Sequence, residues 1–84
     1  MTLNELQANL RAILAAEEQP HIDWAMVEAM CLETIDRLNT EEPPAYPHDV
    51  VYHFLDDADI RQNDVRYATV QRKRIMTWLA APNS

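Results

Sequence analysis

The chain has 84 residues and a net charge of −7, with 14 acidic and 7 basic side chains. This length suits one compact domain and is too short for two. The sequence contains no glycine, which excludes a P-loop, a dinucleotide-binding fingerprint and a Gly-x-Ser-x-Gly nucleophile elbow. We therefore predict that residues 1–84 form a single domain that binds no cofactor and is not an enzyme.

The cellular location of the protein is indicated by features that the sequence lacks. Cys31 is the single cysteine, so no disulfide can form within the chain. Residues 1–16 lack the basic start and the apolar run of a signal peptide. No segment has the roughly 18–20 apolar residues needed to cross a bilayer. These features predict a cytoplasmic protein that does not enter a membrane.

The first helix is predicted over residues 3–18. Thr2 and Glu5 have the spacing of a capping box, in which each side chain bonds the backbone of the other residue. Five apolar residues then recur at helical spacing and form one stripe: Leu3, Leu6, Leu10, Ile13 and Leu14. Pro20 marks the break after this helix.

A second helix is predicted over residues 23–38, with Asp23 as its N-cap. Its apolar face is broad and consists of Trp24, Val27, Met30, Cys31, Ile35 and Leu38. Because Cys31 lies in the middle of this face, we expect a buried, unreactive thiol. Residues 39–47, which include three prolines, are predicted to form a connector.

Residues 48–58 fit a helix or a strand, because their composition is β-prone. We favour a helix, since no partner strand is evident and one face is apolar at helical spacing: Val50, Val51, Phe54, Leu55 and Ala58. A turn is predicted near Asn63. In the absence of glycine, Asn39 and Asn63 are the expected left-handed residues at helix ends.

The last helix is predicted over residues 64–80, with Pro82 ending it. Its apolar face consists of Tyr67, Ala68, Ile75, Trp78 and Leu79, and Gln71 lies between them. Val70 and Met76 fall on the opposite side, which is basic. The predicted fold is therefore all-α, a small bundle of about four short helices.

The strongest functional signal is charge asymmetry. Residues 1–42 carry nine acidic and two basic side chains, whereas residues 43–84 are neutral overall. On the second helix, an exposed apolar residue and three carboxylates share the outer face, and we predict that they bind a basic protein partner: Glu28, Leu32, Glu33 and Asp36. The predicted function is that of an inhibitor, an immunity-type protein or an adaptor.

Two other interpretations remain open. In the first, the chain forms a homodimer in which the acidic second helix of one subunit meets the basic last helix of the other. In the second, Asp56, Asp57, Asp59 and His53 form a metal-binding or hydrolytic site. The ordinary alternative for this second cluster is that Asp57 or Asp59 caps the next segment while Arg61 and Arg66 form ion pairs with neighbouring residues.

A nucleic-acid partner is disfavoured. The consecutive residues Arg72, Lys73 and Arg74 are basic, but proteins that bind nucleic acid usually carry a positive charge over the whole domain. A single basic turn more often forms a solvated helix face.

Overall fold

The computed structural model describes residues 1–81, and this part of the chain contains helices and no strands. The expected all-α fold is therefore confirmed, with five helices instead of about four. They are α1 (Leu3–Glu17), α2 (Trp24–Thr40), α3 (His48–Asp56), α4 (Ala58–Asn63) and α5 (Val65–Ala80).

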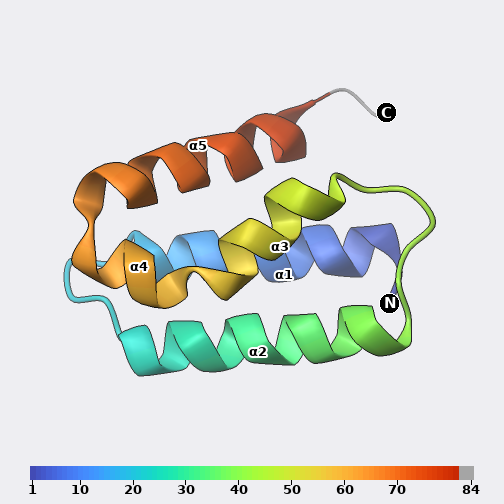
Figure 1. The fold of residues 1–84 in the computed structure, drawn as a ribbon, viewed down its shortest axis with the longest axis horizontal. Helices are drawn as coiled ribbons and strands as arrows, with labels where there is room; N and C mark the ends of the chain where they lie inside the picture. Colours follow the sequence, from blue (N-terminus) through green and yellow to red (C-terminus); the bar gives the residue numbers. More distant parts are fainter. Residues whose placement is uncertain (82–84) are drawn as a thin grey trace.

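The helices form an antiparallel bundle with four corners, one of which is shared by α3 and α4 (Figure 1). α1 packs against α2 and α5, and the α3–α4 pair also packs against both α2 and α5. α2 and α5 do not contact each other, so they occupy diagonal corners. The outward sides of α2 and α5 therefore face opposite sides of the molecule.

The starts of α1 and α2 follow the capping residues expected from the sequence, and α5 begins with a cap of the same kind. The Thr2 hydroxyl accepts from the Glu5 backbone N–H (3.1 Å), and the Glu5 carboxylate accepts from the Thr2 N–H (2.8 Å). Asp23 and Asp64 cap α2 and α5, each accepting from the backbone N–H three residues on (3.1 and 3.0 Å). These bonds satisfy N–H groups that have no partner within the helix.

The helix ends differ from expectation. α2 continues through Asn39 to Thr40, so the connector begins at Glu41 rather than at residue 39. No described residue has a positive φ, so the prediction of left-handed asparagines at positions 39 and 63 is wrong. Asn39 lies inside α2 and Asn63 is the last residue of α4, and the residues that follow these helices, Glu41 and Asp64, have negative φ values of −140° and −137°. Pro82 lies outside the described residues.

The fifth helix arises because residues 58–63, predicted to lead into a turn, are helical. At the joint, the Asp57 N–H donates to the His53 carbonyl (3.2 Å), and the Asp57 carbonyl accepts from the Arg61 N–H (2.9 Å). The first bond closes the end of α3 and the second opens α4, so the chain turns at Asp57 and the two helices follow each other directly along one corner of the bundle. α4 is held because Ala58 and Arg61 are both buried.

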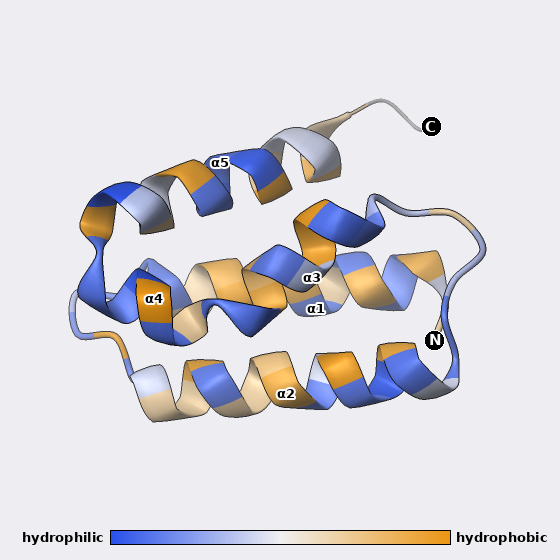
Figure 2. Cartoon of the chain, in the orientation of Figure 1, coloured by the Kyte–Doolittle hydropathy of each residue, from blue (hydrophilic) through white to orange (hydrophobic). Residues whose placement is uncertain are grey.

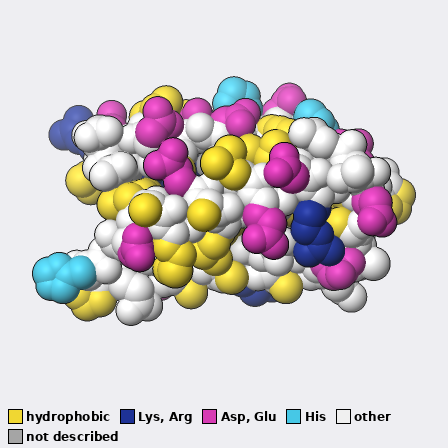
Figure 3. Space-filling model, turned by 90° about the horizontal axis from the view of Figure 1, so that it is seen from below, with side chains coloured by type: hydrophobic (Ala, Val, Ile, Leu, Met, Phe, Trp, Pro, Cys, Tyr) yellow, Lys and Arg dark blue, Asp and Glu magenta, His cyan; other side chains and the backbone are white. Residues whose placement is uncertain are grey.

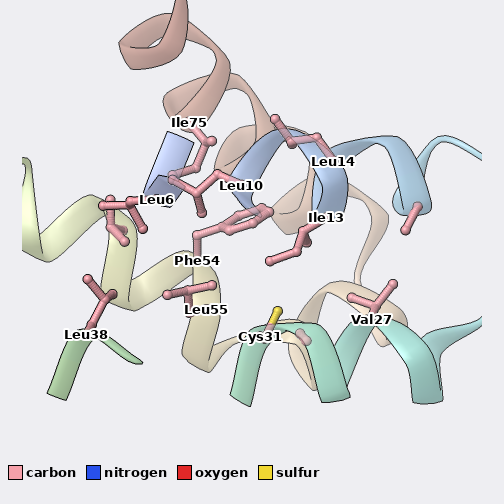
Figure 4. Close-up of a cluster of buried hydrophobic side chains, with 13 residues drawn as sticks. Leu6, Leu10, Ile13, Leu14, Val27, Cys31, Leu38, Phe54, Leu55 and Ile75 are labelled. Atoms are coloured by element: carbon pink, nitrogen blue, oxygen red, sulfur yellow. The ribbon is translucent and has the colours of Figure 1, made fainter. Parts of the chain in front are cut away.

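The core lies between the four corners. Figure 4 shows Phe54 at its centre, with side chains of α1, α2 and α5 around it. The predicted stripe of α1 is buried except for Leu3, which is partly exposed, and Ala16 and Glu17 are buried as well. Hydrophobic and hydrophilic segments alternate along the helices (Figure 2), as in amphipathic helices around one core. Among residues 1–81, no helix combines the length and the apolar content that a bilayer crossing requires.

Candidate protein-binding face

The four predicted partner-binding residues lie together on the outward side of α2. Leu32 is 60% exposed, and Glu28, Glu33 and Asp36 are also exposed. Glu28 and Asp36 are one helical turn before and after Leu32, so the three share a face. The inner side of α2 fixes this orientation, because it buries Val27, Cys31, Thr34 and Leu38. We call the four exposed residues the α2 face.

The carboxylates of the α2 face are not neutralised by neighbours. Among the described residues, none of the three forms a salt bridge or a side-chain hydrogen bond. Arg37, the one basic residue of α2, pairs with Glu5 of α1 instead (3.3 Å). Figure 3 shows acidic side chains spread over this side of the molecule, with apolar side chains between them. The α2 face therefore presents an uncompensated negative charge to solvent.

The centre of this side of α2 is apolar. Ala25 and Ala29 are exposed beside Leu32, at spacings that place all three along one line of the helix. Their small side chains leave Leu32 standing above its surroundings. An apolar centre with a charged border is the usual anatomy of a protein interface.

α5 carries a matching basic surface. Val70 is 48% exposed, and Arg66 and Arg74 lie one turn before and after it, with Lys73 alongside. None of these three cations forms a salt bridge within residues 1–81. Val70 was expected on the outer side of the helix, and its exposure confirms this. We call Arg66, Val70, Lys73 and Arg74 the α5 face.

Arg72 does not belong to the α5 face, although it is adjacent in sequence to Lys73. Its side chain is 22% exposed and turns inward, where Nε donates to Glu17 Oε1 (3.0 Å). The basic run therefore divides between the core and the surface.

The most unexpected polar feature is a buried ion pair between α1 and α4. Arg61 was predicted to pair locally, but its guanidinium instead binds the Glu17 carboxylate (Nη2 to Oε2, 2.8 Å), and both side chains are 0% exposed. A signal for this pair was present in the sequence. Glu17 and Arg61 each continue the apolar spacing of their helices, so two opposite charges stood at core positions.

The rest of the Arg61 guanidinium is also bound. Nη1 donates to the Gln71 side chain (2.8 Å) and to the backbone carbonyl of Phe54, and the group lies over the Phe54 ring at 3.9 Å. No described buried side-chain nitrogen or oxygen lacks a partner. Because the cluster joins three corners of the bundle and is shielded from solvent, it has a structural role.

Cys31 borders this cluster, with its sulfur 3.9 Å from Arg61 Nη2. The thiol is buried, as expected, and burial raises its pKa to about 11. It is therefore protonated at neutral pH, and a protonated thiol is a poor nucleophile and metal ligand.

The structure separates the residues of the alternative metal or hydrolytic site. Asp57 accepts hydrogen bonds from the Tyr67 hydroxyl (2.5 Å) and the Gln71 amide (3.1 Å), while Asp56, Asp59 and His53 are exposed. Within the described part of the chain, no three His, Cys, Asp or Glu side chains converge on a position for a metal ion. Asp57 thus connects the α3–α4 joint to α5.

No protein family, curated protein or solved structure matches this chain.

Proposed function

We propose that this chain is a non-enzymatic protein-binding module, an inhibitor, immunity-type protein or adaptor, whose α2 face binds a basic surface of another protein. The observation that supports this proposal is the arrangement of three carboxylates without salt-bridge partners around the 60% exposed Leu32. The surface belongs to a regular helix packed on the core, so it needs little ordering on binding.

The geometry of the α2 face defines the complementary partner. Glu28 and Asp36 are eight residues apart, which corresponds to about 12 Å along the helix. The partner therefore carries Lys or Arg side chains separated by about this distance, with an apolar depression between them for Leu32. Arginine suits the carboxylates best, because its planar guanidinium binds them in a bidentate manner.

Charge and burial contribute differently to such binding. An exposed ion pair contributes only about 0.2–1 kcal/mol, whereas burial of a leucine side chain contributes about 1.5–3 kcal/mol. The carboxylates therefore mainly accelerate association and select the partner, while Leu32 slows dissociation. We expect the association rate to fall steeply with increasing salt.

The test compares two variants that lose the same charge. The α2-neutral variant carries Glu28→Gln, Glu33→Gln and Asp36→Asn, and the control carries Glu18→Gln, Asp56→Asn and Asp59→Asn, all at exposed positions. A protein captured from host lysate is identified and purified, and its Kd for each variant is measured by calorimetry. Thermal unfolding checks that both variants are folded.

The proposal requires the α2-neutral variant to bind at least about tenfold more weakly, about 1.4 kcal/mol, with the control near wild type. Equal weakening of both variants would show that only the total charge matters. Unchanged binding of the α2-neutral variant would remove the α2 face from the interface. Either of the last two results overturns the proposal.

A further inference from the structure

We infer that the α2 face also binds the α5 face of a second copy of this chain. This inference rests on the proposed function in so far as both use the α2 face as an acidic docking surface. It adds a specific occupant, whose chemistry is present in the same molecule.

The two faces are complementary in charge and spacing. Leu32 lies between Glu28 and Asp36 on α2, and Val70 lies between Arg66 and Arg74 on α5, with i±4 spacing in both cases. The charged residues of each pair are therefore about 12 Å apart. When α5 of one copy lies along α2 of another, each carboxylate meets a guanidinium while the two apolar residues meet between them.

Both faces are available for this contact. Leu32 and Val70 are 60% and 48% exposed, and the charged residues around them form no salt bridges with residues 1–81. Docking therefore does not require breaking an existing ion pair in that part of the chain. It also shields apolar side chains that are otherwise in water.

The positions of the faces determine the form of the assembly. α2 and α5 occupy diagonal corners of the bundle, so their outward sides face away from each other (Figure 1). A two-fold dimer would need both faces on one side to make the two contacts at once. The contact is instead head-to-tail, and each added copy leaves one free α2 face and one free α5 face.

Head-to-tail association also affects the proposed function. A copy whose α2 face is occupied by a neighbour cannot bind another basic protein through it. Only the copy at one end of each head-to-tail assembly retains a free α2 face. Self-association and partner binding are therefore competing uses of the same surface.

The first measurement is sedimentation of the full chain over a range of concentrations. At about 0.05 M salt, the weight-average mass should rise continuously with concentration and pass that of a dimer, and at about 0.5 M salt the rise should disappear because charges are screened. A mass that stays at the monomer under both conditions, or that stops at a dimer, would contradict the inference.

The decisive measurement uses two variants that each lack one face. The α5-neutral variant carries Arg66→Gln, Lys73→Gln and Arg74→Gln, and the α2-neutral variant is the one defined above. Each should remain monomeric alone. An equal mixture should form a complex of two molecules and grow no further, because the intact α5 face of one fits the intact α2 face of the other.

Thermal unfolding of each variant alone checks that both are folded before they are mixed. Self-association of the α5-neutral variant alone, or no complex in the mixture of two folded variants, overturns the inference. The α5-neutral variant retains its α2 face and should still bind a basic protein partner. Failure of self-association is thus distinguishable from failure of the proposed function.

Discussion

Arg61 and Glu17 are 44 positions apart in the sequence, and their side chains form an ion pair that is fully shielded from solvent. Glu17 also binds Arg72, so one carboxylate serves two guanidinium groups. This arrangement holds α4 and α5 against the end of α1. Removing one member of a buried ion pair is costly, because the remaining charge loses both its partner and its hydration.

We predict that Glu17→Leu destabilises the domain more than Arg61→Met. Glu17→Leu leaves two guanidinium groups without a carboxylate and should cost about 3–5 kcal/mol, a large part of the total expected from about 0.05–0.15 kcal/mol per residue. Arg61→Met leaves Glu17 paired with Arg72 and should cost less. Urea unfolding measures both free energies.

The double variant Glu17→Leu with Arg61→Met provides the control for this prediction. It removes both members of the pair and replaces them by apolar side chains, which is often nearly neutral at buried sites. It should therefore be more stable than Glu17→Leu alone. A double variant whose loss equals the sum of the single losses would show that the two side chains are not energetically coupled.

The Cys31 thiol should be unreactive in the folded protein. Burial raises its pKa from 9.0 to about 11, which lowers the thiolate fraction near neutral pH by about 100-fold. Modification by a disulfide reagent should be slower by at least this factor in the native protein than in urea. Comparable rates in the two conditions would contradict the buried position of Cys31.

The same shift in pKa predicts a decrease in stability at alkaline pH. Because the folded pKa is the higher one, the unfolded chain releases the thiol proton first as pH rises. The contribution of Cys31 is therefore fully present below about pH 9 and is lost progressively as pH approaches 11. A Cys31→Ala variant should lack this alkaline loss of stability. Urea unfolding of both proteins over the same pH range measures the difference.

Two leucines with opposite environments allow stability and binding to be separated. Leu10 is 0% exposed and Leu32 is 60% exposed. Leu10→Ala should destabilise the fold by about 2–5 kcal/mol, whereas Leu32→Ala should change stability by no more than about 0.5 kcal/mol. Thermal and urea unfolding measure these effects. A strongly destabilised Leu32→Ala protein would show that this side chain has a role in the fold.

Asp57 should control the ionisation of Tyr67. The Tyr67 hydroxyl donates to the Asp57 carboxylate at 2.5 Å, and this hydrogen bond raises the tyrosine pKa. Asp57→Asn should return the Tyr67 pKa towards its ordinary value. An ultraviolet absorbance titration follows the change, and a Tyr67→Phe background should abolish it. Titration curves that coincide with and without Asp57→Asn would contradict the interaction.

Much of the fold follows from local signals in the sequence. The caps at Thr2 and Asp23 predict the starts of α1 and α2, and the apolar stripes predict the inner faces of α1, α2 and α5. The α4 helix is not predicted by these signals, because Arg61 follows the apolar spacing of Phe54 and Ala58 but carries a charge whose partner, Glu17, is 44 positions away. The ion pair depends on how α1 and α4 pack, which short helices leave open.

The α2 face shows the same division between local and global information. Its exposure follows from helical periodicity, since Val27, Cys31 and Leu38 define the opposite side. Its relation to the α5 face depends on which corner of the bundle each helix occupies. The sequence alone does not exclude an arrangement in which α2 and α5 are neighbours. Both faces would then lie on one side of the molecule, and a two-fold dimer would be as reasonable as a head-to-tail contact.

The backbone of this domain also bears on how its sequence can change. No described residue has a positive φ, and the chain contains no glycine, so no position in residues 1–81 depends on the absence of a β-carbon. The connectors between α1 and α2 and between α2 and α3 still contribute a few specific contacts, because Asp23 caps α2, Ile22 and Tyr46 pack against the core, and Pro43 is buried. The exposed residues of these connectors are therefore free to diverge over evolution, whereas a substitution at Glu17 or Arg61 requires a compensating substitution at the other.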